Sequence, residues 1–213
     1  MYTNPDFVYG GVRETVAAVR QHSGNFVIVG RRVSIDAAPL CRRRSTMRHT
    51  EILRLGHELG QVDPEHAGWA MDYFIFTKYS LPLASMPPFI VGVWRWDNWL
   101  FGEVVRFGAA HVVDASDTIA ATHIGRTSVG LSERSGAKYN NDLWRAALPG
   151  NQPIPKPAGL GDMQFATYFS VQHGSMPYLV YKDTAALLVG QHVEEIRRAA
   201  ALPPSAEPSL HNN

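Results

Sequence analysis

The sequence predicts an α/β protein, because short apolar, β-branched segments alternate with segments of helical periodicity. The clearest strand signals are NFVIVG at 25–30 and MDYFIFT at 71–77, and the first of these reads as a buried, parallel strand. Val12, Val16 and Val19 recur at helical spacing before the first of these strands. The 213 residues are 45% hydrophobic and 18% charged, which is enough for one substantial core. We therefore expect a mixed sheet flanked by helices.

Other elements follow the same alternation. A helix is expected from near Thr50 to Gly60, and another from Asp97 to Gly108. Strands are expected at 111–115 and 118–124, followed by polar, loop-like chain to about 157 and a last helix near 184–201. These expectations divide the chain into an α/β domain at 1–157, a helical extension at 158–202 and a disordered tail at 203–213.

Composition excludes several classes of function. Twenty Lys and Arg balance nineteen Asp and Glu, so no overall field attracts nucleic acid. The arginines at 42–44 lack interleaved aromatic residues, and we interpret them as a solvated loop. Cys41 is the only cysteine, which fits a reducing, cytoplasmic compartment. No apolar run approaches the roughly 20 residues that a membrane-spanning helix needs, and the first residues do not form a signal peptide.

Five segments, in this order, carry a resemblance to a known family: YTNPDF (2–7), FVIVGRRVSID (26–36), GWAMDYFIF (68–76), MPPFIVGVWRWDNWL (86–100) and VVDASDTIAATHI (112–124). Together they resemble bacterial GT-A-type nucleotide-diphospho-sugar glycosyltransferase-like proteins over a little over half of the chain. The resemblance implies a GT-A-like, Rossmann-related sheet and covers its acceptor-side half. A nucleotide crevice is normally built from the first strands of such a sheet. Either a short strand lies within the first residues, or the first βα units are absent.

The resemblance implies a metal site. In that class a short acidic motif after a central strand binds a divalent cation on the donor diphosphate, and Asn4 and Asp6 match it. Asn4 departs from the motif because it keeps an oxygen ligand but removes a charge. His123 matches a further ligand, and imidazole suits manganese better than magnesium. The structural alternatives are an Asn-Pro-Asp turn and a histidine that only satisfies a local hydrogen bond.

The resemblance also implies a catalytic base, Asp97, at the start of a helix on the acceptor side. A base must lie near the attacking hydroxyl on a rigid element, which a helix start provides. Trp96 is expected to offer a platform to a sugar ring, and Asn98 to hydrogen-bond either the acceptor or the loop. The alternative for Asp97 is an N-cap, since Asp is among the residues that cap helices best.

Three further residues are expected near the substrate, and for Asp72 and Trp69 this is what the resemblance implies. Asp72 lies inside an apolar strand, where a carboxylate is costly unless it is paired or used. Trp69 is expected to stack beside it. Arg31, with its neighbour Arg32, either pairs with Asp72 or meets substrate oxygens in bidentate fashion.

These residues favour a transferase that moves a sugar from a nucleotide-diphosphate donor to an unknown acceptor, assisted by Mn²⁺ or Mg²⁺. The alternative is a non-catalytic or truncated remnant that serves as a binding module. A nucleic-acid-binding protein is a weaker rival that rests only on the arginines at 42–44.

Overall fold

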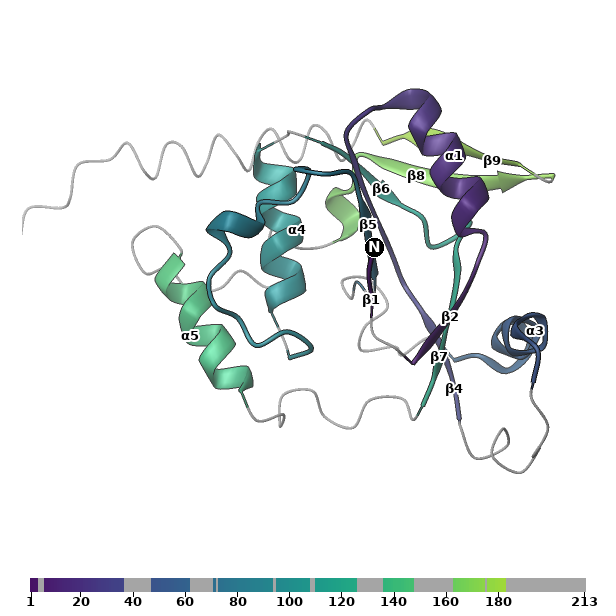
Figure 1. Ribbon diagram of the computed structural model, residues 1–213, viewed down its shortest axis with the longest axis horizontal. Helices are drawn as coiled ribbons and strands as arrows, with labels where there is room; N and C mark the ends of the chain where they lie inside the picture. Colours follow the sequence, from purple (N-terminus) through teal and green to yellow (C-terminus); the bar gives the residue numbers. More distant parts are fainter. Residues whose placement is uncertain are drawn as a thin grey trace, which may run out of the picture.

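The structure is a computed structural model that describes residues 1–3, 6–36, 47–61, 71, 73–93, 95–107, 110–125, 136–147, 163–174 and 176–182. In these ranges it is an α/β fold with one six-stranded sheet, one three-stranded sheet and flanking helices (Figure 1). The expected fold class is therefore confirmed at the level of mixed sheets and helices.

The large sheet has the strand order β1-β5-β3-β6-β8-β9. β3 pairs in parallel with β6, and β6 with β8, whereas β5 and β9 are antiparallel to their neighbours. Because β1 is antiparallel to β5, and β5 to β3, β1 runs in the same direction as β3. The carboxyl ends of β1, β3, β6 and β8 therefore point the same way. The strands are β1 (Tyr2–Thr3), β3 (Phe26–Gly30), β5 (Tyr73–Phe76), β6 (His111–Asp114), β8 (Tyr168–His173) and β9 (Met176–Tyr181).

The small sheet has the order β2-β7-β4, with β2 antiparallel and β4 parallel to β7. Its strands are β2 (Phe7–Gly10), β4 (Val33–Ile35) and β7 (Ala120–Ile124). Each of them is the next strand along the chain after a strand of the large sheet, namely β1, β3 and β6. The chain thus leaves the carboxyl edge of the large sheet three times to enter the small one. These three crossings bring residues that are far apart in sequence to one junction.

Helices cover both sheets. In Figure 1, α4 and α5 lie on one side of the large sheet, α1 lies on the other, and α3 lies beside the small sheet. None of the helices in the described ranges is both long enough and apolar enough to cross a membrane. The helices are α1 (Val12–His22), α3 (His49–Leu59), α4 (Trp96–Phe107) and α5 (Ala137–Ala147), with 3-10 turns η1 (Leu83–Ser85) and η5 (Met163–Phe165).

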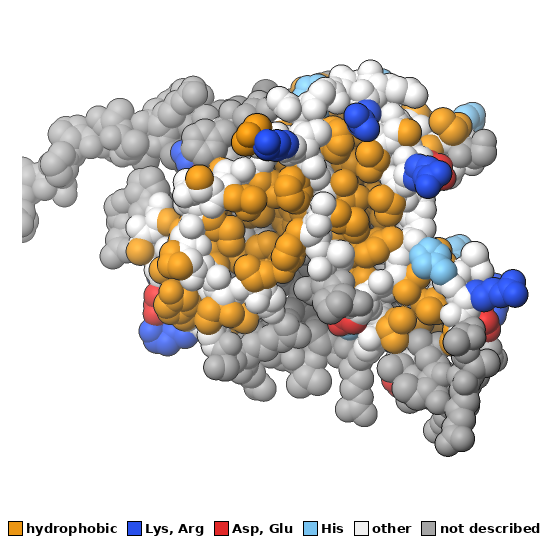
Figure 2. Space-filling view, viewed as in Figure 1, with side chains coloured by type: hydrophobic (Ala, Val, Ile, Leu, Met, Phe, Trp, Pro, Cys, Tyr) orange, Lys and Arg blue, Asp and Glu red, His pale blue; other side chains and the backbone are white. Residues whose placement is uncertain are grey.

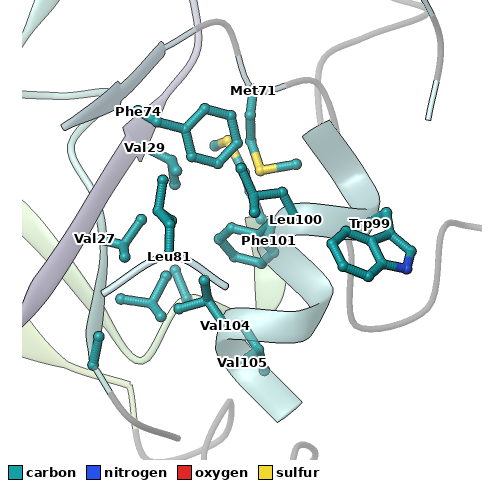
Figure 3. Close-up of a cluster of buried hydrophobic side chains, with 14 of the residues drawn as sticks. Val27, Val29, Met71, Phe74, Leu81, Trp99, Leu100, Phe101, Val104 and Val105 are labelled. Carbon is teal, nitrogen blue, oxygen red and sulfur yellow. The ribbon is translucent and has the colours of Figure 1, made fainter. Parts of the chain in front are cut away.

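Two apolar cores fill the space on either side of the large sheet. On the α4 side, Leu100, Phe101 and Val104 pack against Val27 and Phe74 (Figure 3). On the opposite side, Val19 of α1 packs with the other face of the same strands. Figure 2 shows apolar side chains gathered over the region of α4 and α5. Because β3 contributes to both cores, all five of its residues are buried, as expected of a central strand.

Most predicted elements are present. The helix through Val12, the helix after Thr50 and the helix containing Asp97 are confirmed as α1, α3 and α4. The strand at 25–30 is β3, which is parallel to β6 but antiparallel to β5. The two strands expected at 111–124 are β6 and β7, and they belong to different sheets.

Two predictions about the C-terminal part are wrong. The chain expected to be loop-like up to 157 contains α5, whose inward positions are Ala137, Asn140 and Trp144. An asparagine in the middle of that face obscured the helical period. The expected helical extension at 158–202 contains the hairpin β8–β9, which pairs with β6 and so belongs to the large sheet. The helix expected at 184–201, the tail at 203–213 and the arginines at 42–44 lie outside the described residues.

Candidate functional site

The small sheet brings Asp6 and His123 together from positions 117 residues apart. His123 of β7 lies between Phe7 of β2 and Ser34 of β4 in one cross-strand row. The carbonyl of Asp6, just before β2, accepts a hydrogen bond from the N–H of Ile124 at 3.0 Å. This backbone bond fixes Asp6 at the end of β7, within reach of the imidazole.

Both nitrogens of the His123 ring have a partner. Nε2 lies 3.0 Å from Oδ2 of Asp6, and Nδ1 lies 3.3 Å from Oγ of Ser34. A neutral imidazole donates from one nitrogen and accepts at the other, and a hydroxyl serves either need. Ser34 is buried, whereas the Asp6 side chain is 48% exposed, so the pair opens to solvent on the carboxylate side. The arrangement orients the ring and presents an oxygen and a nitrogen side by side.

An aromatic ring and a cation lie next to this pair. The Phe7 ring lies 5.2 Å from the His123 ring, centre to centre, and the Arg32 guanidinium carbon lies 5.8 Å from the centre of Phe7. The opposite face of the small sheet is covered by α3, where Gly56 lies against Thr122. The face that carries Phe7, His123 and Arg32 is therefore the one turned away from α3.

A divalent cation is chemically compatible with Asp6 and His123. As it stands, the 3.0 Å contact is a hydrogen bond that His123 Nε2–H donates to the Asp6 carboxylate, and a cation bound by both groups would take the place of that proton. The Ser34 hydroxyl on the other ring nitrogen is the kind of outer partner that metal-bound histidines have. The described ranges contain no group of three or more His, Cys, Asp or Glu that could hold a metal. Such a pair suits an ion that keeps several waters and takes phosphate oxygens from a ligand.

The crossing from β3 to β4 contains Arg31, which is tied to the large sheet. Its backbone N–H and its Nε both point to Oγ of Ser116, at 3.1 and 3.4 Å. Ser116 in turn donates to Oδ1 of Asp114 at 2.6 Å, and its backbone N–H does so at 3.0 Å. Asp114 therefore closes a turn after β6.

Asp97 lies in the first turn of α4 and is not its N-cap. The helix begins at Trp96, and the N–H of Trp99 bonds to the carbonyl of Arg95 at 2.9 Å, so Arg95 is the cap residue. The N-cap prediction for Asp97 is wrong for this reason. The carboxylate still accepts from the N–H of Asn98 at 2.9 Å, which favours a negative charge at the helix start.

Two ionisable side chains lie close to Asp97. Burial, and after it the charge of Asp97, raises the pKa of the Tyr2 hydroxyl. Burial lowers the pKa of the Arg95 guanidinium, while Asp97 opposes that shift and Arg145 adds to it. Arg95 has a φ of 89°, stacks on Trp144 at 5.6 Å and donates from Nε to Asn141 at 3.0 Å. The start of α4 is thus anchored to α5.

Of the other predicted substrate residues, the structure describes Trp96 and Asn98 but not Asn4, Trp69 or Asp72. Trp96 packs edge-on against Tyr2 with ring centres 4.9 Å apart, so much of its ring contacts protein. Asn98 is 4% exposed and has little surface to offer a ligand. Asn4, Trp69 and Asp72 lie outside the described residues, and their roles stay predictions.

β1 lies between Asp97 and the small sheet. Tyr2 packs towards the start of α4, and the hydroxyl of the next residue, Thr3, hydrogen-bonds the hydroxyl of Tyr9 in β2. From Tyr2 to Asp6 the chain spans at most about 14 Å, because each residue extends at most about 3.6 Å. The candidate base and the candidate metal pair therefore lie at the two ends of one short segment.

Sequence reasoning did not single out Ser34 and gave Arg32 no role separate from that of Arg31. A signal existed for Ser34, since it is a polar residue between Val33 and Ile35 in a strand. No signal assigned Arg32 to the small sheet, because the partition of strands between two sheets depends on long-range pairing. No protein-family model, curated protein or solved structure matches this chain.

Proposed function

We propose that this protein is a GT-A-like glycosyltransferase that moves a sugar from a nucleotide-diphosphate donor to an acceptor hydroxyl. The observation that carries the proposal is the 3.0 Å contact between Asp6 and His123. These are two of the positions for which the family resemblance implies metal ligands, and they lie far apart in sequence. A second support is that Asp6 lies in the crossing from β1 to β2, which starts at the carboxyl edge of the large sheet, where α/β sheets bind ligands.

Asp6 and His123 would hold the divalent cation, manganese or magnesium, in this proposal. Bound there, the ion supplies positive charge against the donor diphosphate and so stabilises the leaving group. Ser34 keeps the His123 ring in place through Nδ1. The exposed side of Asp6 leaves room for phosphate oxygens to approach the pair.

Asp97 is the general base. Its carboxylate takes the proton of the acceptor hydroxyl as that oxygen bonds to the anomeric carbon. The bond from this carbon to the donor phosphate oxygen breaks, and the nucleoside diphosphate leaves. The first turn of a helix packed on the core holds the carboxylate in place.

The test is turnover by the full-length protein expressed from its own gene. A panel of UDP-, GDP- and dTDP-sugars with Mn²⁺ should show metal-dependent release of one nucleoside diphosphate. Asp97→Asn should lower that rate by roughly 10²-fold or more. Glu103→Gln is the matched control, since it changes a carboxylate on the same helix that pairs with Arg106. Equal rates in wild type and Asp97→Asn would remove the base from the mechanism.

The alternative is a binding module without catalysis. It is favoured by the presence of only two candidate metal ligands at this site in the described ranges. Metal-dependent binding of a nucleotide sugar, with no release of nucleoside diphosphate in the presence of acceptors, would select this alternative over the transferase.

A further inference from the structure

We propose that Arg32 and Phe7 form a phosphate-binding arm beside the Asp6–His123 pair, and that its ligand is the diphosphate of the donor. This inference rests on the proposed function for the identity of the donor. It assigns the recognition of the phosphates to a cation of the chain itself, in addition to any metal ion.

The geometry places the guanidinium next to the pair. The guanidinium carbon of Arg32 lies 5.8 Å from the centre of the Phe7 ring. The same ring lies 5.2 Å from the ring of His123, centre to centre, so the cation and the imidazole both lie next to one aromatic side chain. Phe7 also stacks on Tyr9, with ring centres 5.7 Å apart and an interplanar angle of 13°. The Phe7 ring, over which the Arg32 guanidinium lies, therefore contacts both His123 and Tyr9.

The chemistry of an arginine suits a diphosphate better than that of other cations. A guanidinium presents several N–H donors in one plane and can bond two phosphate oxygens at once, while its flat face stacks on an aromatic ring. It also keeps its charge at any physiological pH. A stacked guanidinium has fewer orientations to lose when it binds, so binding costs less entropy.

Topology brings the arm to the edge that ligands use. Arg32 lies in the crossing from β3 to β4, and Asp6 in the crossing from β1 to β2. Both crossings start at the carboxyl edge of the large sheet. The two residues thus belong to different chain segments that converge on one place, one with a positive and one with a negative charge. The Asp6 carboxylate would repel a phosphate bound between these two residues. The proposed metal ion beside Asp6 would neutralise that charge.

Arg31 provides a matched comparison within the chain. Its backbone N–H and Nε contact Ser116 of the large sheet, whereas the Arg32 side chain lies over Phe7 of the small sheet. The two arginines have the same chemistry and adjacent positions but reach different sheets. The proposal assigns the phosphate to Arg32 alone and so replaces the expectation from the sequence that Arg31 meets substrate oxygens, because Arg31 is held to Ser116 of the large sheet.

The experiment is calorimetric titration of the full chain with inorganic pyrophosphate, with and without Mn²⁺, and with orthophosphate in a parallel series. Wild type should bind pyrophosphate more tightly than orthophosphate. Arg32→Gln should weaken pyrophosphate binding by roughly tenfold or more, since a charged hydrogen-bond partner is lost. Arg31→Gln should change it by less than about twofold. Arg32→Lys should recover only part of the affinity, because a lysine cannot form the bidentate, stacked contact.

Thermal melting of each variant shows whether it is folded, and the Arg32→Lys variant keeps the test informative if Arg32→Gln is unstable. Equal losses in Arg31→Gln and Arg32→Gln would overturn the assignment, as would the absence of pyrophosphate binding in wild type. If Arg32→Gln leaves nucleotide-sugar turnover unchanged, the assignment of Arg32 to the donor phosphates is overturned while the proposed function stands. Pyrophosphate binding that depends on Arg32, without any turnover, would support the arm while the transferase proposal fails.

Discussion

The large sheet and the small sheet differ in the side chains that fill the space around them. Around the large sheet most buried side chains are apolar, as with Phe101, which is 0% exposed between α4 and the sheet, and a smaller number, such as Thr15 and Asn140, are polar. The small sheet has a row of polar groups instead, in which Asp6, His123 and Ser34 bond to one another. Apolar packing stabilises without chemical specificity, whereas a polar row is costly unless it is satisfied or used. The polar row is the feature on which the proposed metal site rests, whereas the proposed base Asp97 lies on α4, which packs on the large sheet.

The largest expected effect is a loss of folding stability in the core between α4 and the large sheet. Phe101→Ala should lower the free energy of unfolding by about 3–5 kcal/mol, because it leaves a cavity in the α4 core. Leu83→Ala, at a position that is 55% exposed, should change it by no more than about 0.5 kcal/mol. Urea denaturation followed by circular dichroism measures both. A loss of less than about 1 kcal/mol in Phe101→Ala would mean that α4 does not anchor the large sheet.

The next effect concerns the contact between α3 and the small sheet. A Cβ added at Gly56 would lie 2.2 Å from Oγ1 of Thr122 on β7. Gly56→Ala should therefore destabilise by about 1–3 kcal/mol through overpacking, although alanine in a helix is otherwise favoured over glycine by about 1 kcal/mol.

The double variant Gly56→Ala with Thr122→Ala should recover part of that loss, since it removes the obstructing atoms. The two single variants and the double variant form a cycle whose coupling energy is read from urea midpoints. A Gly56→Ala protein that is more stable than wild type would show that α3 does not pack closely against β7 at this position.

A smaller effect separates function from stability in the polar row. Ser34→Ala removes the partner of Nδ1 and should weaken Mn²⁺ binding by roughly tenfold, while stability falls by only about 1 kcal/mol. Ser34→Thr keeps the hydroxyl and should restore most of the Mn²⁺ affinity. Unchanged Mn²⁺ affinity in Ser34→Ala would show that the hydroxyl does not position the imidazole.

The smallest effect tests how near Asp97 lies to β1. The charge of Asp97 helps to raise the pKa of Tyr2, so Asp97→Asn should lower that pKa, while burial still holds it above the ordinary value. A raised tyrosine pKa contributes stability below about pH 10 that is lost as the pH rises through the folded value. NMR titration of ¹³C-labelled tyrosine, with Tyr2 assigned through Tyr2→Phe, measures the shift. An identical Tyr2 titration in wild type and Asp97→Asn would contradict the placement.

Local signals in the sequence predicted most of the elements but few of their partners. The spacing of Val12, Val16 and Val19 predicted α1, and the apolar run at 26–30 predicted β3. The strands at 111–114 and 120–124 were predicted as well, but their separation into two sheets was not, because pairing with β3 and β2 depends on distant segments. Periodicity carries no information about such pairing.

The candidate site shows the same limit. Family resemblance indicated Asp6 and His123, and their contact is a consequence of the β2–β7 pairing that no local pattern reveals. For Ser34 the sequence shows only a polar residue between two apolar ones, and this pattern alone does not indicate a site. Its role depends on the parallel register that sets it opposite His123.

Asp6 and His123 are proposed to form a metal site, and calorimetric titration with Mn²⁺ measures whether they do. Wild type is expected to bind one Mn²⁺, and His123→Gln and Asp6→Ala are each expected to bind it at least about tenfold more weakly. His57→Gln, on the exposed side of α3, is the control and should bind as wild type does. Equal Mn²⁺ affinity in all four proteins, or no binding by wild type, would contradict the claim.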